Sequence, residues 1–126
     1  FGHGLSYTTF DITNVQADRT TLAANGRIRV SADVTNTGDR AGAEVVQLYI
    51  GDEQSSLPRP VKELKGFQKV SLNPGQTRTV TFEITPGMLQ YYDDAKGAWV
   101  AEPGAFTAYV GAASDDIRGT VEFELK

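Results

Sequence analysis

Cysteine is absent from the 126 residues of this chain, and histidine occurs once, at His3. The missing cysteines exclude a disulfide framework, a thiolate metal site and a cysteine nucleophile. A single histidine is too few for a common metal site and has no positioned partners for a Ser-His-Asp arrangement. Absence of cysteine leaves the compartment open, so secretion, the periplasm and the cytoplasm all remain compatible with the sequence.

Excess positive charge and long apolar runs are also missing. The chain has 12 basic and 16 acidic side chains, for a formal net charge of −4. No basic stripe is available to neutralise phosphates, so we expect no nucleic-acid partner. No run of about 18 apolar residues exists, and we expect no membrane span. The chain begins at Phe1 without an initiator methionine or a signal-peptide pattern, which favours a piece of a longer protein.

Alternation of apolar and polar residues is the strongest pattern that is present. It is clearest over residues 27–34 and 120–125. Period-two alternation places every second side chain on one face of a strand. With turn signals at short intervals, it predicts an all-β sandwich of two antiparallel sheets with seven to nine strands. We assign residues 1–5 to an incoming linker and residues 6–126 to one domain.

Local signals refine this prediction. Residues 43–52 are apolar on both faces, which predicts a central strand or contact with a second partner. Proline favours one helical turn over residues 86–90, and residues 91–97 are predicted to be a loop. The predicted buried set is Phe10, Val30, Val34, Val46, Leu48, Val80, Phe82, Phe106, Val110, Val121 and Phe123.

Five segments, in order along the chain, carry a family resemblance. They are Phe-Gly-His-Gly-Leu-Ser-Tyr-Thr-Thr-Phe at 1–10, Val-Thr-Asn-Thr-Gly-Asp-Arg-Ala-Gly-Ala-Glu-Val-Val-Gln-Leu-Tyr-Ile at 34–50, Pro-Arg-Pro-Val-Lys-Glu-Leu-Lys-Gly-Phe at 58–67, Leu-Asn-Pro-Gly at 72–75 with Val-Thr-Phe at 80–82, and Glu-Pro-Gly at 102–104 with Val-Gly at 110–111. The chain resembles the C-terminal fibronectin type III-like domain of family 3 glycoside hydrolases, the β-glucosidase group.

The resemblance implies an immunoglobulin-like, fibronectin type III-like sandwich that stabilises and packs against catalytic domains. In that family the nucleophilic Asp lies in a (β/α)8 barrel and the acid/base Glu in a following α/β domain, both preceding this module. The resemblance therefore implies no catalytic residue, no cofactor and no metal here. It implies a parent that removes terminal non-reducing β-D-glucosyl residues with retention. The alternative is a free-standing sandwich that binds carbohydrate or another surface.

Two pairs of adjacent acids are the remaining candidates for chemistry, Asp93-Asp94 and Asp115-Asp116. A retaining glycosidase needs two carboxylates about 5–5.5 Å apart across a sugar pocket. Neighbouring side chains in extended chain point to opposite faces, so we interpret both pairs as solvated loop residues. Calcium binding at Asp93 and Asp94 is chemically feasible, but no loop has the spacing of a calcium site.

Contacts with catalytic domains are predicted near the two-proline segment around Arg59. A stiff segment loses little entropy on docking, and a guanidinium suits a carboxylate partner, so Arg59→Ala should destabilise a longer parent more than this chain. The alternative interpretation is that the charged residues here form a plain solvated surface. For His3 the alternative is a linker residue without such contacts. The candidate contact residues are His3, Tyr49, Arg59, Lys62, Lys65 and Phe67.

Three aromatic residues, Tyr91, Tyr92 and Trp99, lie close together in the sequence. They could stack on sugars, as in a carbohydrate-binding module, or belong to the core or an interface. Exposed planar aromatics would favour binding of polysaccharide. An apolar patch around Tyr49 and Phe67 would favour docking on catalytic domains.

Overall fold

The computed structural model describes residues 8–23, 25–52, 62–101 and 103–126. Within these residues the chain forms ten strands and one short 3₁₀ helix. They are β1 (Phe10–Ala17), β2 (Thr21–Leu22), β3 (Ile28–Asn36), β4 (Gly42–Asp52), β5 (Glu63–Leu72), β6 (Thr77–Ile84), η1 (Pro86–Leu89), β7 (Tyr91–Asp93), β8 (Ala98–Val100), β9 (Gly104–Ala113) and β10 (Asp116–Leu125).

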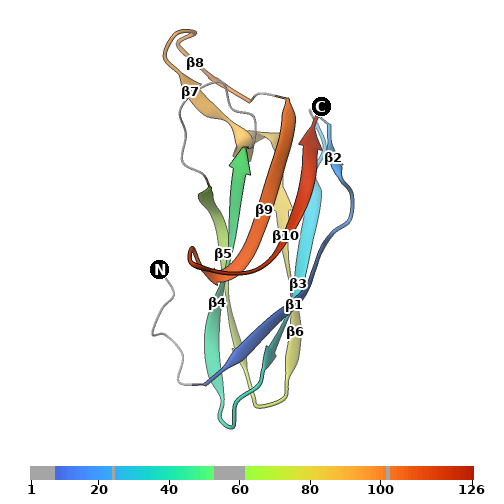
Figure 1. Ribbon diagram of the computed structural model, residues 1–126, viewed down its shortest axis with the longest axis vertical. Helices are drawn as coiled ribbons and strands as arrows, with labels where there is room; N and C mark the ends of the chain where they lie inside the picture. Colours follow the sequence, from blue (N-terminus) through green and yellow to red (C-terminus); the bar gives the residue numbers. More distant parts are fainter. Residues whose placement is uncertain (1–7, 24, 53–61, 102) are drawn as a thin grey trace.

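The strands form two packed sheets and a separate hairpin (Figure 1). One sheet has the order β1-β3-β6, the other β2-β10-β9-β4-β5, and β7 pairs with β8. Every pairing is antiparallel except the short parallel contact of β10 with β2. The predicted all-β sandwich is confirmed. No helix in the described residues is long and apolar enough to cross a membrane.

Short strands make the observed number larger than the predicted seven to nine. Strand β2 has two residues, and β7 and β8 have three each. The segment 91–97, predicted as a loop, instead begins with β7 and continues into a turn. The helical turn predicted after Thr85 is present as η1.

The core lies between the two sheets. Phe106 and Phe123 stack there, with ring centroids 5.6 Å apart and planes 14° from parallel. Of the predicted buried set, only Val121 is partly buried, and it still packs against the core. Strand β4 lies between β9 and β5, so the prediction of a central strand is confirmed.

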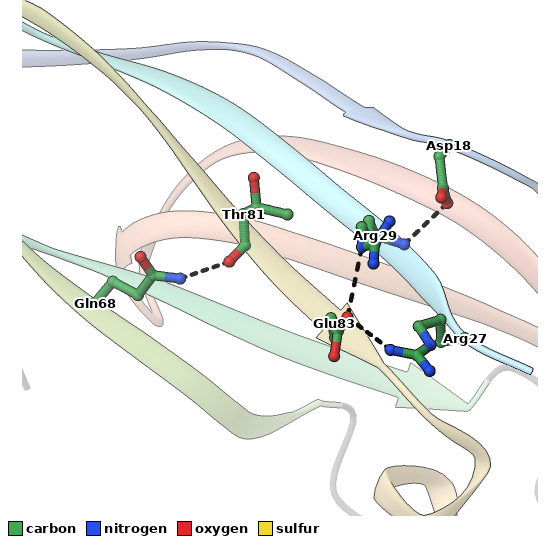
Figure 2. A network of polar contacts seen from close by, with 6 residues as sticks. All are labelled: Asp18, Arg27, Arg29, Gln68, Thr81 and Glu83. Carbon is green, nitrogen blue, oxygen red and sulfur yellow. Dashed lines mark hydrogen bonds and ion pairs between the residues drawn. The ribbon is translucent and has the colours of Figure 1, made fainter.

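Polar side chains connect neighbouring strands of the sandwich. Figure 2 shows Gln68 of β5 donating a hydrogen bond of 2.6 Å to the carbonyl of Thr81 in β6, which links the two sheets. Near it, Arg27 and Arg29 approach Glu83 at 3.3 and 3.4 Å (Figure 2). These ion pairs are exposed to solvent, so each contributes little to the free energy of unfolding.

A buried asparagine, Asn36, joins three segments at the end of the sandwich away from the Arg27–Glu83 ion pair. The side chain of Asn36 is fully buried and donates hydrogen bonds to the carbonyls of Arg40 and Leu72. Its Oδ1 accepts from the backbone N–H of Gly38 and from Thr8 Oγ1. This network holds the start of the described chain against the β3–β4 turn.

Candidate interaction surfaces

The exposed large apolar side chains of the described residues fall into two pairs. Leu64 and Phe67, exposed by 42% and 60%, lie on β5. Tyr92 and Trp99, exposed by 48% and 65%, lie across from each other on β7 and β8. Large apolar groups that stay exposed together often mark an interaction site.

The first pair lies on the outer face of the five-stranded sheet. Gly66 faces the core, because a Cβ built on it would lie 3.4 Å from the ring of Phe82. Its neighbour Phe67 therefore points outward. A bulge in the β4–β5 pairing then places Leu64 opposite Tyr49, on the same outer face as Phe67.

Two side chains of β4 next to this pair are buried. Gln47 is fully buried and lies opposite Phe67, while Tyr49 is 7% exposed and lies between Leu64 and Tyr109. The Tyr49 hydroxyl donates a hydrogen bond to Gln47 Oε1. We call Tyr49, Leu64, Phe67 and Tyr109 the outer patch.

Two lysines flank the outer patch. Lys62 Nζ lies 5.6 Å from the centre of the Tyr109 ring, a cation–π contact. Lys65 Nζ lies 3.7 Å from a carboxylate oxygen of Glu63, and only 20% of the Lys65 side chain is exposed. The patch is therefore apolar at its centre, with Lys62 and the Lys65–Glu63 ion pair near it.

The second pair lies on the β7–β8 hairpin, which extends beyond one end of the sheets (Figure 1). The Tyr92 and Trp99 rings meet edge to face, with centroids 5.6 Å apart and planes at 75°. Asp93 closes the turn: its carboxylate accepts hydrogen bonds from the N–H groups of Ala95 and Lys96, at 3.0 and 3.4 Å. Its carbonyl accepts from the N–H of Gly97 at 2.8 Å.

In each pair of adjacent acids, one carboxylate forms hydrogen bonds within the domain. Asp93 is nearly buried in the turn just described, whereas Asp94 is exposed. Asp116 forms a two-pronged ion pair with Arg118 at 2.6 and 3.1 Å. This hydrogen-bonded carboxylate raises the pKa of Arg118 above its already high ordinary value. No group of three or more acids or histidines among the described residues is arranged to hold a metal ion.

The candidate contact residues are brought together only in part. Tyr49, Lys62, Lys65 and Phe67 gather at the outer patch, but Tyr49 is largely buried. His3 and Arg59 lie outside the described residues, and for Tyr91 only the backbone pairing with Val100 is described. The sequence reasoning did not identify Leu64 or Tyr109 as members of this face. Leu64 could have been noted as an apolar residue between charged neighbours.

Comparison with known proteins identifies the domain. Residues 44–114 match the family model of the fibronectin type III-like domain. The β-glucosidase BoGH3A of Bacteroides ovatus is 54% identical over 98% of this chain, which corresponds to 17% of that protein. A putative β-xylosidase of Formosa agariphila is 43% identical over the whole chain, or 16% of its own length.

Solved structures agree with this match. The β-glucosidase EmGH1 of Erythrobacter marinus superposes on the whole chain with a TM-score of 0.91 at 46% identity, and the chain covers 16% of it. A D270A β-glucosidase of Listeria innocua, in complex with laminaribiose, gives a TM-score of 0.90 at 37% identity and 17% coverage. The chain thus spans about a sixth of the length of these relatives. The resemblance read from the sequence is confirmed, and the chain belongs to the fibronectin type III-like domain family.

Proposed function

We propose that this chain is a non-catalytic module of a larger β-glucosidase-type hydrolase, and that it stabilises the enzyme by packing its outer patch against the catalytic domains. The parent would remove terminal non-reducing β-D-glucosyl residues with retention. The relatives support this assignment, because they are β-glucosidases and β-xylosidases of which this chain matches only a small part.

The observation that carries the proposal is the exposure of Phe67, with Leu64 beside it, on the outer face of the five-stranded sheet. Phe67 is 60% exposed, so covering it with a second surface would lower the free energy of the docked state. Complete burial of such a side chain stabilises by about 1.5–3 kcal/mol, so covering the exposed part of Phe67 would contribute about 1–2 kcal/mol. Leu64 adds to the same surface.

The surrounding charges fit a docking role. Lys62 and Lys65 are already held by Tyr109 and Glu63, so they lose little rotamer freedom when a partner approaches. An apolar centre with a polar margin is the usual composition of a protein interface. The expected partner surface is apolar, with an acidic group opposite Lys62.

Substitution of Phe67 in two contexts tests the proposal. Phe67→Ser should lower the melting temperature of the full-length enzyme and leave that of the 126-residue chain nearly unchanged, because Phe67 is covered only in the former. Trp99→Ser is the matched control, since it removes a similarly exposed aromatic from another element. Equal melting temperatures of wild-type and Phe67→Ser full-length enzymes would contradict the docking role.

A further inference from the structure

Strand β6 is a free edge of the three-stranded sheet. It pairs with β3 on one side and has no strand partner on its other side among the described residues. All eight of its residues pair with β3 without a register shift, so the edge is regular. A regular edge strand presents a row of unpaired N–H and C=O groups, to which a strand of another chain can add.

The other edge strands of the described residues are shorter or irregular. Strand β1 has a register shift between Thr13 and Gln16, with Asn14 in the left-handed conformation at φ of 56°. Strand β2 has only two residues, and the pairing of β5 with β4 contains a bulge. Bulges and short lengths hinder the addition of a further strand. The edge of β6 is therefore the one most open to strand addition.

The odd-numbered residues of β6 direct their backbone groups toward this free edge. The carbonyl of Gln76, next to β6, accepts a hydrogen bond of 3.1 Å from the N–H of Asn36 at the end of β3. Even-numbered residues therefore face β3. Successive residues of a strand direct their N–H and C=O groups to opposite sides, so those of Thr79, Thr81 and Glu83 point away from β3.

Gln68 of β5 engages one of these outward groups (Figure 2). Its Nε2 donates a hydrogen bond of 2.6 Å to the carbonyl of Thr81. Gln68 pairs with Val46 of β4, a core residue, so its side chain leaves β5 on the inner face and reaches across to β6. A strand that added to β6 at Thr81 would have to break this hydrogen bond.

Arg78 places a charge on the inner face of the same edge. It pairs with Val34 of β3, which is fully buried, and the next inner residue of β6, Val80, is buried as well. Arg78 itself is exposed and lines an open hollow between the two sheets together with Leu72 of β5. An inward-pointing charge on an edge strand is a recognised obstacle to edge-to-edge pairing.

A second copy of the chain is the partner that this edge would admit. It presents the same outward groups, and residues 80–84, Val-Thr-Phe-Glu-Ile, are mostly β-branched or aromatic. In an antiparallel pairing centred on Thr81, Arg78 would lie opposite Ile84 of the second copy. Because Ile84 is fully buried, this pairing would bring a guanidinium group against an apolar core, which is costly.

We propose that Gln68 and Arg78 prevent the β6 edge from pairing with a second copy of the chain. Gln68 keeps the outward carbonyl of Thr81 occupied, and Arg78 opposes the antiparallel register. The outer patch is built from β4, β5 and β9, so this role of the β6 edge does not rest on docking through that patch.

Removal of both groups tests the proposal in the 126-residue chain. Gln68→Met/Arg78→Val deletes the amide donor and the charge, and sedimentation velocity should find it mostly dimeric at about 100 µM, where the wild type is monomeric. Gln16→Met/Arg19→Val is the matched control, because it makes the same two exchanges at exposed positions and should stay monomeric. A folded, monomeric Gln68→Met/Arg78→Val chain overturns the proposal, and so does equal association of the control.

Amide hydrogen exchange locates the contact. The N–H groups of Thr79 and Glu83 should exchange at least about tenfold more slowly in the associated variant than in the wild type. Association that leaves these two amides unprotected, or that a further Phe67→Ser exchange abolishes, would place the contact elsewhere and overturn the proposal. Protection of the same amides that grows with wild-type concentration would also overturn it, because the edge would then be open.

A more conservative variant decides the matter if the first one does not fold. Gln68→Ser/Arg78→Thr removes the same donor and the same charge without adding apolar surface. It should also associate, more weakly than Gln68→Met/Arg78→Val, and with the same two amides protected. A folded chain of this kind that remains monomeric overturns the proposal.

Discussion

Gly66 of β5 and Phe82 of β6 face each other across the core, and a Cβ at Gly66 would lie 3.4 Å from Cδ1 of Phe82. This contact fixes the orientation of β5. It directs residue 66 inward and leaves Phe67 on the outside, 60% exposed. The same strand therefore closes the core and presents the outer patch.

Truncation of Phe82 should destabilise the isolated chain much more than truncation of Phe67. Phe82→Ala removes a buried ring and should lower the free energy of unfolding by about 3–5 kcal/mol. Phe67→Ala removes an exposed ring and should change it by less than about 1 kcal/mol. Urea denaturation measures both values, and similar losses would mean that the orientation of β5 is wrong.

Arg118 should stabilise the domain more than a typical surface arginine does. It forms the two-pronged pair with Asp116 and donates to the carbonyl of Phe10 at 3.3 Å, so it joins β10 to β1. The side chain is one-third exposed, and Arg118→Met should cost about 1–2 kcal/mol after allowance for solvent screening.

Arg40→Met is the matched control for that substitution. Arg40 lies 3.7 Å from the carboxylate of Asp39, and both side chains are well exposed. Its loss should change stability by less than about 0.5 kcal/mol. Equal effects in the two arginine variants, measured by thermal and urea unfolding, would show that the link from β10 to β1 carries no stability.

Asp93 and Asp94 provide an adjacent pair for testing the hairpin. Asp93→Ala removes the acceptor for the N–H groups of Ala95 and Lys96 and should destabilise by about 1–2 kcal/mol. Asp94→Ala alters an exposed side chain and should have an effect within about 0.5 kcal/mol. Unfolding followed by Trp99 emission reads the hairpin directly, and a larger loss for Asp94 would contradict the assigned turn.

The purified chain should not hydrolyse an aryl β-glucoside. Asp93 is held in the turn and Asp116 in the ion pair with Arg118, so neither acid pair presents two carboxylates to a sugar. The measurement is release of the aryl group under conditions in which a full-length relative is active. Turnover that persists after stringent purification, and that tracks the chain through a second column, would refute this expectation.

Alternation of apolar and polar residues predicted those strands that have one buried and one more exposed face. Strand β3 alternates between buried and more exposed residues along its whole length, as residues 27–34 indicated. Strand β4 was recognised as central because Val45 and Tyr49 add a second apolar face, and both are buried. These features depend on local periodicity, which a single sequence contains.

Contacts between distant residues could not be predicted in the same way. Leu64 and Phe67 are three residues apart, a spacing that places them on opposite faces of a regular strand, but the bulge puts both on the outer face. Leu22 lies in a polar stretch, yet it is fully buried where β2 pairs with the end of β10. The turn signals around Asp93 and Gly97 concealed the hairpin that pairs Tyr92 with Trp99.

The most direct test of the docking role is the solvent accessibility of Phe67 in the two contexts. Hydroxyl-radical footprinting, read by mass spectrometry, reports oxidation of individual aromatic side chains. We expect rapid oxidation of Phe67 in the 126-residue chain, where it is 60% exposed, and strong protection in the full-length enzyme. Trp99 is the internal reference and should oxidise at similar rates in both. Equal oxidation of Phe67 in the chain and in the full-length enzyme would show that the outer patch remains uncovered and would contradict the proposed function.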